Sequence, residues 1–330
     1  MHSESTPKGD LVKLQRNMLS EADARAMLER IRWPEGVRCI SEGCEGTEVY
    51  RIETKPSVRK DGRPVPARHL YKCKTCRKQF SVTKGTIFED SKIPLTTWIS
   101  VMYRMCSSKK GVSAFQIHRE FGIFYEAAWF MCHRIRWAMT DKEHSLLSGI
   151  VEADETYVGG KPRGHAEHIG KNMTRGERMR ANWNRKTPVF GMLERGGRVR
   201  AMAIPGINKA AAQAQLRKHV DLPHAMLITD EHPMYGGIIN SLPHGVIRHS
   251  SEYVRGAVHT QGIESFWAGL KRGLYSTFHH VDSGYLNQYV QEFAYRHNTR
   301  EIQDVERFTS LLGRTEGRVD WYLGKNAKGE

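Results

Sequence analysis

Four of the six cysteines form two close pairs along the chain, Cys39 with Cys44 and Cys73 with Cys76. Strand-like sequence adjoins each pair, so we expect both pairs on turns of β-hairpins. A turn that carries two thiolates presents two sulfurs at one spot, and two such turns complete the tetrahedron that Zn²⁺ prefers. The pattern predicts a zinc ribbon over residues 35–84, in which one structural zinc ion substitutes for the core that so small a module lacks.

The two cysteine pairs differ in spacing. Two residues separate Cys73 from Cys76, as is usual in zinc sites, whereas four separate Cys39 from Cys44. A further 28 residues lie between the pairs. The match is good without being ideal, and unligated thiols are the alternative interpretation.

The charge of the chain indicates a polyanionic partner. Lys and Arg number 51 against 36 Asp and Glu, which gives a net charge of +15 and an isoelectric point near 9.6. No apolar run approaches the ~20 residues of a membrane span, and the first residues lack the apolar stretch of a signal peptide. We therefore expect a cytoplasmic protein whose partner is nucleic acid and not a membrane. A merely basic surface is the alternative.

The length of 330 residues predicts two or three domains. Residues 1–34 contain a lead-in helix over 21–33, which Pro34 ends. Residues 92–141 are helical, with segments at 95–106, 113–121 and 125–139 and a break at Gly122. Cys106 and Cys132 lie in these apolar helices and are expected to be small buried hydrophobes.

The break at Gly122 suggests a helix-turn-helix, with Ser113 placed to cap the middle helix. The last helix would then enter a DNA groove. A plain helical linker is the alternative. The exposed candidates for DNA contact on the last helix are Tyr125, Glu126, His133 and Arg134.

From residue 149 to 300 the pattern changes to short apolar strands and helices, which predicts a mixed α/β layer. A helix capped by Asn208 separates the first three strands from the next, and a hairpin through residues 195–197 joins the second strand to the third. A further helix is expected before the last strand. The predicted strands cover 151–158, 188–195, 199–205, 225–230 and 245–250.

Between the first two strands lies a basic insert, residues 161–186, with eight Lys or Arg against two Glu. Little in it can enter a core, so we expect a loop that becomes ordered on a phosphate backbone. A solvated loop without function is the alternative. Its candidate DNA contacts are Lys161, Arg163, Arg178, Arg180, Arg185 and Lys186. Residues 301–330 are expected to be a C-terminal tail.

Three acids stand where such a fold would gather them. Asp154 lies inside the first strand, Asp230 ends an apolar strand, and Glu264 opens a helix. Three carboxylates within ~4 Å repel one another by several kcal/mol, so a cation must offset them. Oxygen ligands without His or Cys indicate Mg²⁺ or Mn²⁺, and two ions would suit phosphoryl transfer. Three unrelated surface acids are the alternative.

Two further acids flank Asp154. Glu152 would share its face of the strand, whereas Glu155 should point to the opposite face, so Glu152 is the nearer substitute as a ligand. Lys271 lies nearly two turns beyond Glu264 on the same helical face, where it would meet a DNA backbone. Arg272 could do the same from a slightly rotated position.

Four polar residues near these strands are weaker candidates. A lone His is more often packed or exposed than a proton-transfer group, which makes His249, His259 and Tyr253 secondary. Asn298 is expected to cap or pack against the sheet.

The stretches DETYVGGK, ITDEHPMY and HTQGIESFWAGLKRG together resemble the DDE transposases of the IS1595 family, also called ISXO2-like transposases. The likeness extends through the cysteine ribbon, GTIFEDSKIPLTTW and SSKKGVSAFQIHREFGIFYEAAWFMCHRIR. It covers most of residues 20–300. The agreement of several motifs in the same order makes it specific.

This resemblance implies a multidomain α+β protein with an N-terminal zinc ribbon, a helix-turn-helix segment and a ribonuclease H-like catalytic domain. It implies that Asp154, Asp230 and Glu264 are the catalytic carboxylates that hold two Mg²⁺ or Mn²⁺ ions. It further implies that Cys39, Cys44, Cys73 and Cys76 bind zinc.

The activity that the resemblance implies is hydrolytic cleavage of double-stranded DNA at the terminal inverted repeats of an insertion sequence. The freed 3′-hydroxyl would then attack target DNA. Such a protein would work at the bacterial nucleoid as a homodimer or larger homo-oligomer, because two ends must be paired.

Two other functions stay open. One is a transposase-derived zinc protein that binds DNA without catalysis, although such a protein would have no reason to keep three mutually repelling acids. The other is a nuclease of related fold that acts on branched or hybrid substrates.

Overall fold

The computed structural model describes residues 20–65, 67–142, 145–159, 186–235, 243–247 and 258–317. The chain divides into two compact units. The first comprises Met1–Ser107, Ala114–Ala138 and Ile302–Glu330, and the second comprises Ser108–Ser113 and Met139–Glu301. None of the helices in the described part of the chain is both long and apolar enough to cross a membrane.

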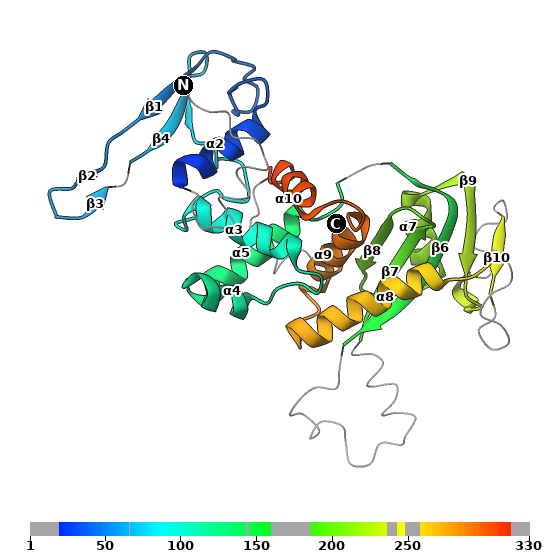
Figure 1. Ribbon diagram of the computed structural model, residues 1–330. Coiled ribbons are helices and arrows are strands. Elements are labelled where there is room, and N and C mark those ends of the chain that lie inside the picture. Colours follow the sequence, from blue (N-terminus) through cyan, green and yellow to red (C-terminus); the bar gives the residue numbers. More distant parts are fainter. Residues whose placement is uncertain are drawn as a thin grey trace. The chain divides into compact units, whose positions relative to one another are not determined.

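The first unit holds the cysteine-rich sheet and five helices among its described residues. Its antiparallel sheet has the order β1-β4-β5, and β2 and β3 pair to extend the β1–β4 hairpin (Figure 1). The elements are α2 (Glu21–Arg32), β1 (Val49–Glu53), β2 (Ser57–Val58), β3 (Pro64–Val65), β4 (His69–Cys73), β5 (Gln79–Phe80), α3 (Leu95–Ser107), α4 (Ala114–Phe121), α5 (Tyr125–Ala138) and α10 (Asp304–Gly313).

The predicted lead-in helix is confirmed as α2. Ser20 caps its first turn by accepting from the amide of Asp23 at 3.1 Å. The helix ends at Arg32 because Pro34 disfavours helical geometry at the residue before it. That residue, Trp33, packs its ring edge-on against Tyr71 of β4, with centroids 5.5 Å apart. The end of α2 is thereby docked on the ribbon.

The three predicted central helices are confirmed as α3, α4 and α5. Gly122 joins the last two at φ +63°, a left-handed conformation that glycine adopts without strain. His118 of α4 bonds through Nδ1 to the carbonyl oxygen of Ile123 at 2.6 Å, which ties α4 to this turn. Cys106 and Cys132 are buried, as predicted for small hydrophobic side chains.

The interpretation of residues 301–330 as a tail is wrong for α10. This helix buries Phe308, Leu311 and Leu312, and Phe308 meets the ring of Tyr103 on α3 at 5.7 Å. Arg307 also donates to the carbonyl of Cys106 at 3.2 Å. An amphipathic helix with this much buried surface belongs to the core of the first unit.

The second unit is a five-stranded mixed sheet with the order β10-β9-β6-β7-β8. The first three strands in sequence are antiparallel neighbours, β9 is parallel to β6, and β10 is parallel to β9. The elements are β6 (Leu147–Val158), β7 (Thr187–Glu194), β8 (Val199–Ala203), α7 (Lys209–His219), β9 (Val220–Thr229), a 3₁₀ turn (η2, Pro233–Tyr235), β10 (His244–Val246), α8 (Gln261–Gly273), a π-helical turn (η3, Leu274–Phe278) and α9 (Leu286–Asn298).

Helices cover both faces of this sheet. Residues of α8 and α9, among them Phe266, Trp267 and Phe293, pack with the strands on one face. Ala212 and Leu216 of α7 pack with those on the other face. Figure 1 shows α8 lying along the sheet. The face under α8 is the one on which the candidate site is built.

Four of the predicted strands and the Asn208 cap are confirmed; the fifth, predicted over 245–250, is observed only as β10 (His244–Val246), and its residues 248–250 lie outside the described part of the chain. The side chain of Asn208 accepts from the amide of Ala211 at 2.9 Å, and the β7–β8 turn closes with Gly197 donating to the carbonyl of Glu194 at 2.8 Å. The helix predicted between β9 and β10 is present only as η2 among the described residues. Residues 236–242 lie outside that part of the chain.

Candidate active site and zinc site

The four cysteines predicted to bind zinc lie together in the first unit. Their sulfur atoms all lie within 4.8 Å of one another. The Sγ atoms of Cys39 and Cys76 are 3.6 Å apart, and those of Cys44 and Cys73 are 3.8 Å apart. Sulfurs at the corners of a tetrahedron with Zn–S bonds of ~2.3 Å stand about 3.8 Å apart. The cluster therefore has the donor set and the size that a structural zinc ion requires.

The first cysteine loop accommodates its wider spacing in a turn. The amide of Cys44 donates to the carbonyl of Ser41 at 3.0 Å, and Gly43 adopts a left-handed φ of +72°. The loop also comes very close to the second one, because a Cβ on Gly46 would stand 2.8 Å from Sγ of Cys73. The long spacer thus brings Cys44 to the cluster without distortion.

Backbone amides favour the thiolate form of Cys73. Its pKa is lowered to about 6, chiefly by the amide of Cys76; burial acts in the opposite direction, and the amide of Thr75 adds to the lowering. Because Zn²⁺ binds thiolates and not thiols, this sulfur is prepared as a ligand.

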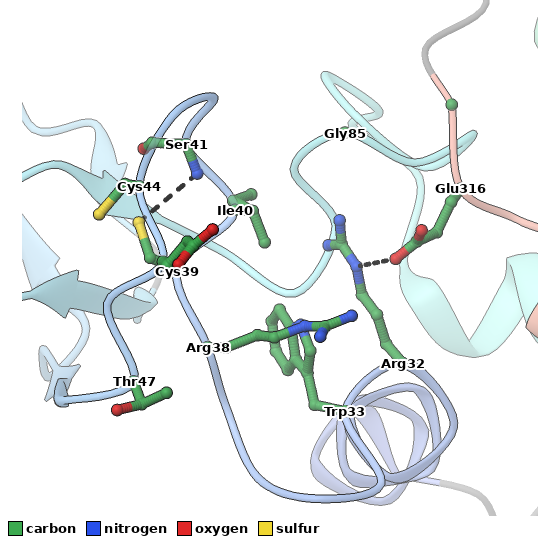
Figure 2. Close-up of a pocket in the computed structure, with 12 residues that line it drawn as sticks. Arg32, Trp33, Arg38, Cys39, Ile40, Ser41, Cys44, Thr47, Gly85 and Glu316 are labelled. Atoms are coloured by element: carbon green, nitrogen blue, oxygen red, sulfur yellow. Dashed lines mark hydrogen bonds and ion pairs between the residues drawn. The ribbon is translucent and has the colours of Figure 1, made fainter.

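An open pocket of about 730 Å³ lies beside the first cysteine loop (Figure 2). Arg32 in its wall is already paired, since Nε donates to Glu316 at 3.2 Å and Nη1 to the carbonyl of Val82 at 2.7 Å. The wall adds Arg38 and Glu45, so its charges balance. Nothing in this lining selects an anion or a cation.

In the second unit, Asp154 and Asp230 come together on neighbouring strands. Strands β6 and β9 are parallel, with Glu152 opposite Ile228. Asp154 lies two residues beyond Glu152 on β6, and Asp230 lies two residues beyond Ile228, directly after the end of β9 at Thr229. Adjacent strands stand ~4.8 Å apart, and side chains two residues apart share a face. The register therefore brings these two predicted acids near each other, and the negative charge of Asp230 acts on Asp154.

The electrostatics of the site reflect this proximity. The pKa of Asp154 is raised to about 7, first by burial and then by the negative charges of Glu155 and Asp230. The pKa of Glu155 is raised mainly by burial; a hydrogen bond from Tyr235 opposes the rise and the charge of Asp230 adds to it. A divalent cation would stabilise such a cluster, and its oxygen ligands suit Mg²⁺ or Mn²⁺.

Helix α8, which carries Glu264, packs on the face of the sheet that holds Asp154. Two hydrogen bonds anchor the helix to β6: the amide of Ile263 donates to Oε2 of Glu152 at 2.9 Å, and Nε1 of Trp267 donates to Oδ2 of Asp154 at 2.9 Å. Glu264 lies between these two anchor points along the helix. The third predicted acid is thus carried by an element fixed to the strand of the first.

The three carboxylates do not converge as tightly as the sequence led us to expect. Among the described residues, the cysteine cluster is the only group of three or more His, Cys, Asp or Glu whose ligating atoms all lie within 4.8 Å. Glu264 is exposed, and its carboxylate accepts from Oγ1 of Thr260 one turn earlier at 2.7 Å. The expected spacing of ~4 Å is therefore wrong for this conformation, because Glu264 is turned along its own helix.

Glu152 has a structural task that the sequence did not indicate. It shares the face of Asp154 as predicted, but it is fully buried and bound by Nη2 of Arg195 at 2.8 Å. Oε2 accepts from the amide of Ile263 in the first turn of α8, where the N-cap Thr260 makes no side-chain cap bond. Glu152 therefore caps α8 from the sheet, and this explains an acid inside a buried strand.

We expect Glu152→Ala to destabilise the second unit by roughly 3 kcal/mol, because it removes one partner of a buried ion pair and a helix cap. Glu152→Gln keeps an acceptor for Ile263 and should have a smaller effect. Denaturant unfolding of the full chain measures both variants. Wild-type stability of Glu152→Ala would show that Arg195 and α8 do not depend on this carboxylate.

The predicted DNA contacts have different outcomes in the first unit. Tyr125 is 46% exposed, as the prediction requires. His133 is fully buried in the packing of α5, so its expected exposure is wrong and it is withdrawn as a groove contact. Arg134 is half-buried and donates through Nη1 to the carbonyls of Ile87 and Glu89, both at 3.0 Å, which gives it a structural role.

In the second unit, Lys271 and Arg272 lie in the last turn of α8, with Arg272 exposed and Lys271 half-buried. Lys186 is half-buried just before β7. The other predicted contacts lie outside the described residues, and so do His249 and Tyr253; those contacts are Lys161, Arg163, Arg178, Arg180 and Arg185.

Asn298 packs as expected. Its side chain accepts from the amide of Val199 at 2.8 Å and donates to the carbonyl of the same residue at 3.0 Å, which completes the edge of β8. His259 lies 3.7 Å from the carboxylate of Glu152, in the network that anchors α8.

Sequence reasoning missed two hydrogen-bond donors to the candidate acids. Trp267 donates to Asp154, and the hydroxyl of Tyr235 donates to Oε2 of Glu155 at 2.7 Å. Trp267 follows Glu264 by three residues, and Tyr235 follows Asp230 by five. This spacing was the signal that the sequence offered. An aromatic residue at such spacing otherwise indicates only core packing.

Comparison with known proteins gives two family matches. Residues 146–298 match the ISXO2-like transposase domain, and residues 19–79 match the transposase zinc-ribbon domain. Together the two ranges cover roughly two thirds of the chain, and the first contains all three candidate acids.

A curated relative supports the same grouping. It is described as an uncharacterized protein in transposable element ISH50, from Halobacterium salinarum, and is 28% identical over 307 residues. The alignment covers 90% of this chain and 97% of the relative, so the two proteins are similar over nearly their whole lengths.

Proposed function

Because the chain belongs to the IS1595 family of transposases, we propose that it cleaves DNA at the terminal inverted repeats of an insertion sequence and joins the freed 3′-hydroxyl to target DNA. Asp154, Asp230 and Glu264 are the proposed catalytic carboxylates. The observation that carries this proposal is the parallel register of β6 and β9, in which Glu152 pairs with Ile228 two residues before Asp154 and Asp230, with Asp154 bonded to Trp267 of α8.

The three carboxylates would hold two Mg²⁺ or Mn²⁺ ions. When bound, such ions activate an attacking oxygen and stabilise the departing one in an in-line phosphoryl displacement. The protein's own contribution is positioning: the sheet sets Asp154 beside Asp230, and α8 carries Glu264 along the same face. Asp154 is half-buried, which reduces competition from water and strengthens its attraction for a cation.

The sheet supports a ribonuclease H-like assignment for the second unit. Three antiparallel neighbours, β6, β7 and β8, are followed by two strands parallel to the first, with α8 across one face. Acids on β6, directly after β9 and on α8 are consistent with the proposed catalytic set of a DDE transposase.

DNA binding is proposed to involve both units. The zinc ribbon and the α4–α5 pair, read as a helix-turn-helix with Tyr125 exposed, would recognise the inverted repeats. Lys271 and Arg272 at the end of α8 would contact the backbone near the acids. The basic stretch 161–186 would bind phosphates through its charge. Pairing of two element ends implies a homodimer or larger assembly.

A transposase-derived DNA-binding protein without activity is the second candidate function. The buried, charge-coupled Asp154 argues against it, because a pure binding protein gains nothing from a carboxylate whose ionisation its surroundings oppose.

The decisive experiment incubates the zinc-loaded full chain with DNA that carries the ends of its own element. We expect cleavage and joining when Mg²⁺ or Mn²⁺ is supplied, and binding alone when both are omitted while zinc is retained. Binding without cleavage under every metal condition would favour the inactive DNA-binding protein. Cleavage of branched DNA without joining would favour a nuclease.

A further inference from the structure

We propose that Trp267 is a positioning residue whose indole N–H holds the carboxylate of Asp154 in the orientation that a divalent cation requires. This inference rests on the proposed function, since it concerns the same acids. Trp267 is not one of the acids of the site, and its role would be exerted entirely through Asp154.

The contact itself is direct. Nε1 of Trp267 lies 2.9 Å from Oδ2 of Asp154, and the Trp267 side chain is almost entirely buried. A hydrogen bond to an ionised carboxylate is about twice as strong as one between neutral groups. The indole therefore stabilises the charged form that binds a cation.

The sheet provides a place for this indole. Gly191 on β7 is the register partner of Asp154 on β6. A Cβ at Gly191 would stand 2.6 Å from Cη2 of Trp267, closer than real carbon atoms approach. Only glycine at this position leaves room for the ring directly beside Asp154.

Packing alone does not account for the residue. Trp267 belongs to the apolar cluster under α8, which includes Ile263 and Leu270, and packing in that cluster uses the rings of the indole but not its N–H. The feature that a phenyl ring lacks is the N–H directed at Asp154.

Trp267 also links two of the acids. It follows Glu264 by three residues on α8, so both side chains project from neighbouring positions of one helix. Through Trp267, the helix that carries the third acid fixes the rotamer of the first. Loss of the indole N–H should leave the fold intact. It should let the Asp154 carboxylate rotate away from the orientation that binds the cation.

The test measures Mn²⁺ affinity of the full, zinc-loaded chain without DNA, from the electron paramagnetic resonance signal of free Mn²⁺. Asp154→Asn defines the background from other acids. Trp267→Phe is expected to weaken site-specific binding by about 10- to 100-fold, the range for loss of a group that orients a metal ligand. Gly191→Ala should have a similar effect, because the new methyl displaces the ring from Asp154.

Two matched controls separate positioning from general damage. Trp98→Phe also removes a buried indole N–H, here bonded to Oγ of Ser91 at 2.9 Å in the first unit. Gly269→Ala adds a methyl on α8 where a Cβ meets no atom within 4 Å. Both variants should bind Mn²⁺ like the wild type.

The activity readout distinguishes positioning from misfolding as well. Cleavage by Trp267→Phe should be restored by raising the Mn²⁺ concentration, while its denaturant unfolding measured without Mn²⁺ stays cooperative, as a folded site requires. Wild-type Mn²⁺ affinity in Trp267→Phe, or cleavage that excess Mn²⁺ fails to restore, would overturn the inference. No difference between wild type and Asp154→Asn would instead refute the proposed metal site itself.

Discussion

Replacing Asp230 by Asn is expected to slow cleavage of the element ends by at least ~10³-fold without weakening their binding. The amide is neutral and a poor ligand for a hard cation, while its size is that of the acid. A factor of ~10³ corresponds to about 4 kcal/mol of transition-state stabilisation, within the several kcal/mol that a bound cation contributes. Single-turnover cleavage rates and the dissociation constant for end DNA measure the two quantities.

The fold should survive this substitution. Oδ1 of Asp230 accepts from the amide of His232 at 3.0 Å, and an Asn oxygen can accept the same bond. Asp221→Asn is the matched control, since it removes an acid from the start of the same strand, where the carboxylate contacts His224 at 3.0 Å. Cleavage by Asp230→Asn at the wild-type rate would remove Asp230 from the active site. Equal loss in both variants would assign the effect to charge and not to metal binding.

The backbone of this protein could be predicted wherever a local signal decides it. Pro34 stops α2 by a steric clash, and Asn208 starts α7 by bonding an amide three residues ahead. The pairing of Asp154 with Asp230 was also within reach, because an apolar strand that ends in an acid presents that acid at the strand's carboxyl end.

Side-chain partners that are distant in sequence could not be predicted in this way. The alternation of β6 puts Glu152 and Glu155 on opposite faces, but it does not say which of them has a partner. The partner of Glu152 is Arg195, which is 43 residues away along the chain. Only the packed structure shows that Glu152 is held in an ion pair with Arg195. It also shows that Glu155 lies close enough to Asp154 and Asp230 for their negative charges to interact.

Helix faces misled the sequence argument where polarity and burial disagree. The buried residues of α5 include the polar His133 and Arg136 as well as the apolar Met131 and Ile135. On this helix, polarity therefore does not show which side chains are exposed. A search for exposed polar side chains then selects residues that serve the core. The same limitation hid α10, since its partner helix α3 lies about 200 residues earlier in the chain.

Replacing Cys73 by Ser is expected to remove the zinc ion and to unfold the ribbon over residues 35–84. A serine hydroxyl does not supply the thiolate that completes the tetrahedral site. The free energy of zinc binding in small domains, on the order of 10–16 kcal/mol, is free energy of folding. Apart from the contacts among Trp33, Tyr71 and Phe80, the sheet has little apolar packing to stabilise it, because β1 has no fully buried residue and β5 is two residues long.

Zinc content per chain and amide hydrogen exchange of β1 and β4 measure the loss. Cys132→Ser is the matched control, since Cys132 is a buried cysteine outside the cluster; it should keep one zinc ion per chain and a protected ribbon. The amides of β6 and β9 should stay protected in both variants, because these strands belong to the other compact unit. Full zinc content in Cys73→Ser would refute the site. Lost protection in β6 and β9 would show that the metal stabilises the whole chain and not the ribbon alone.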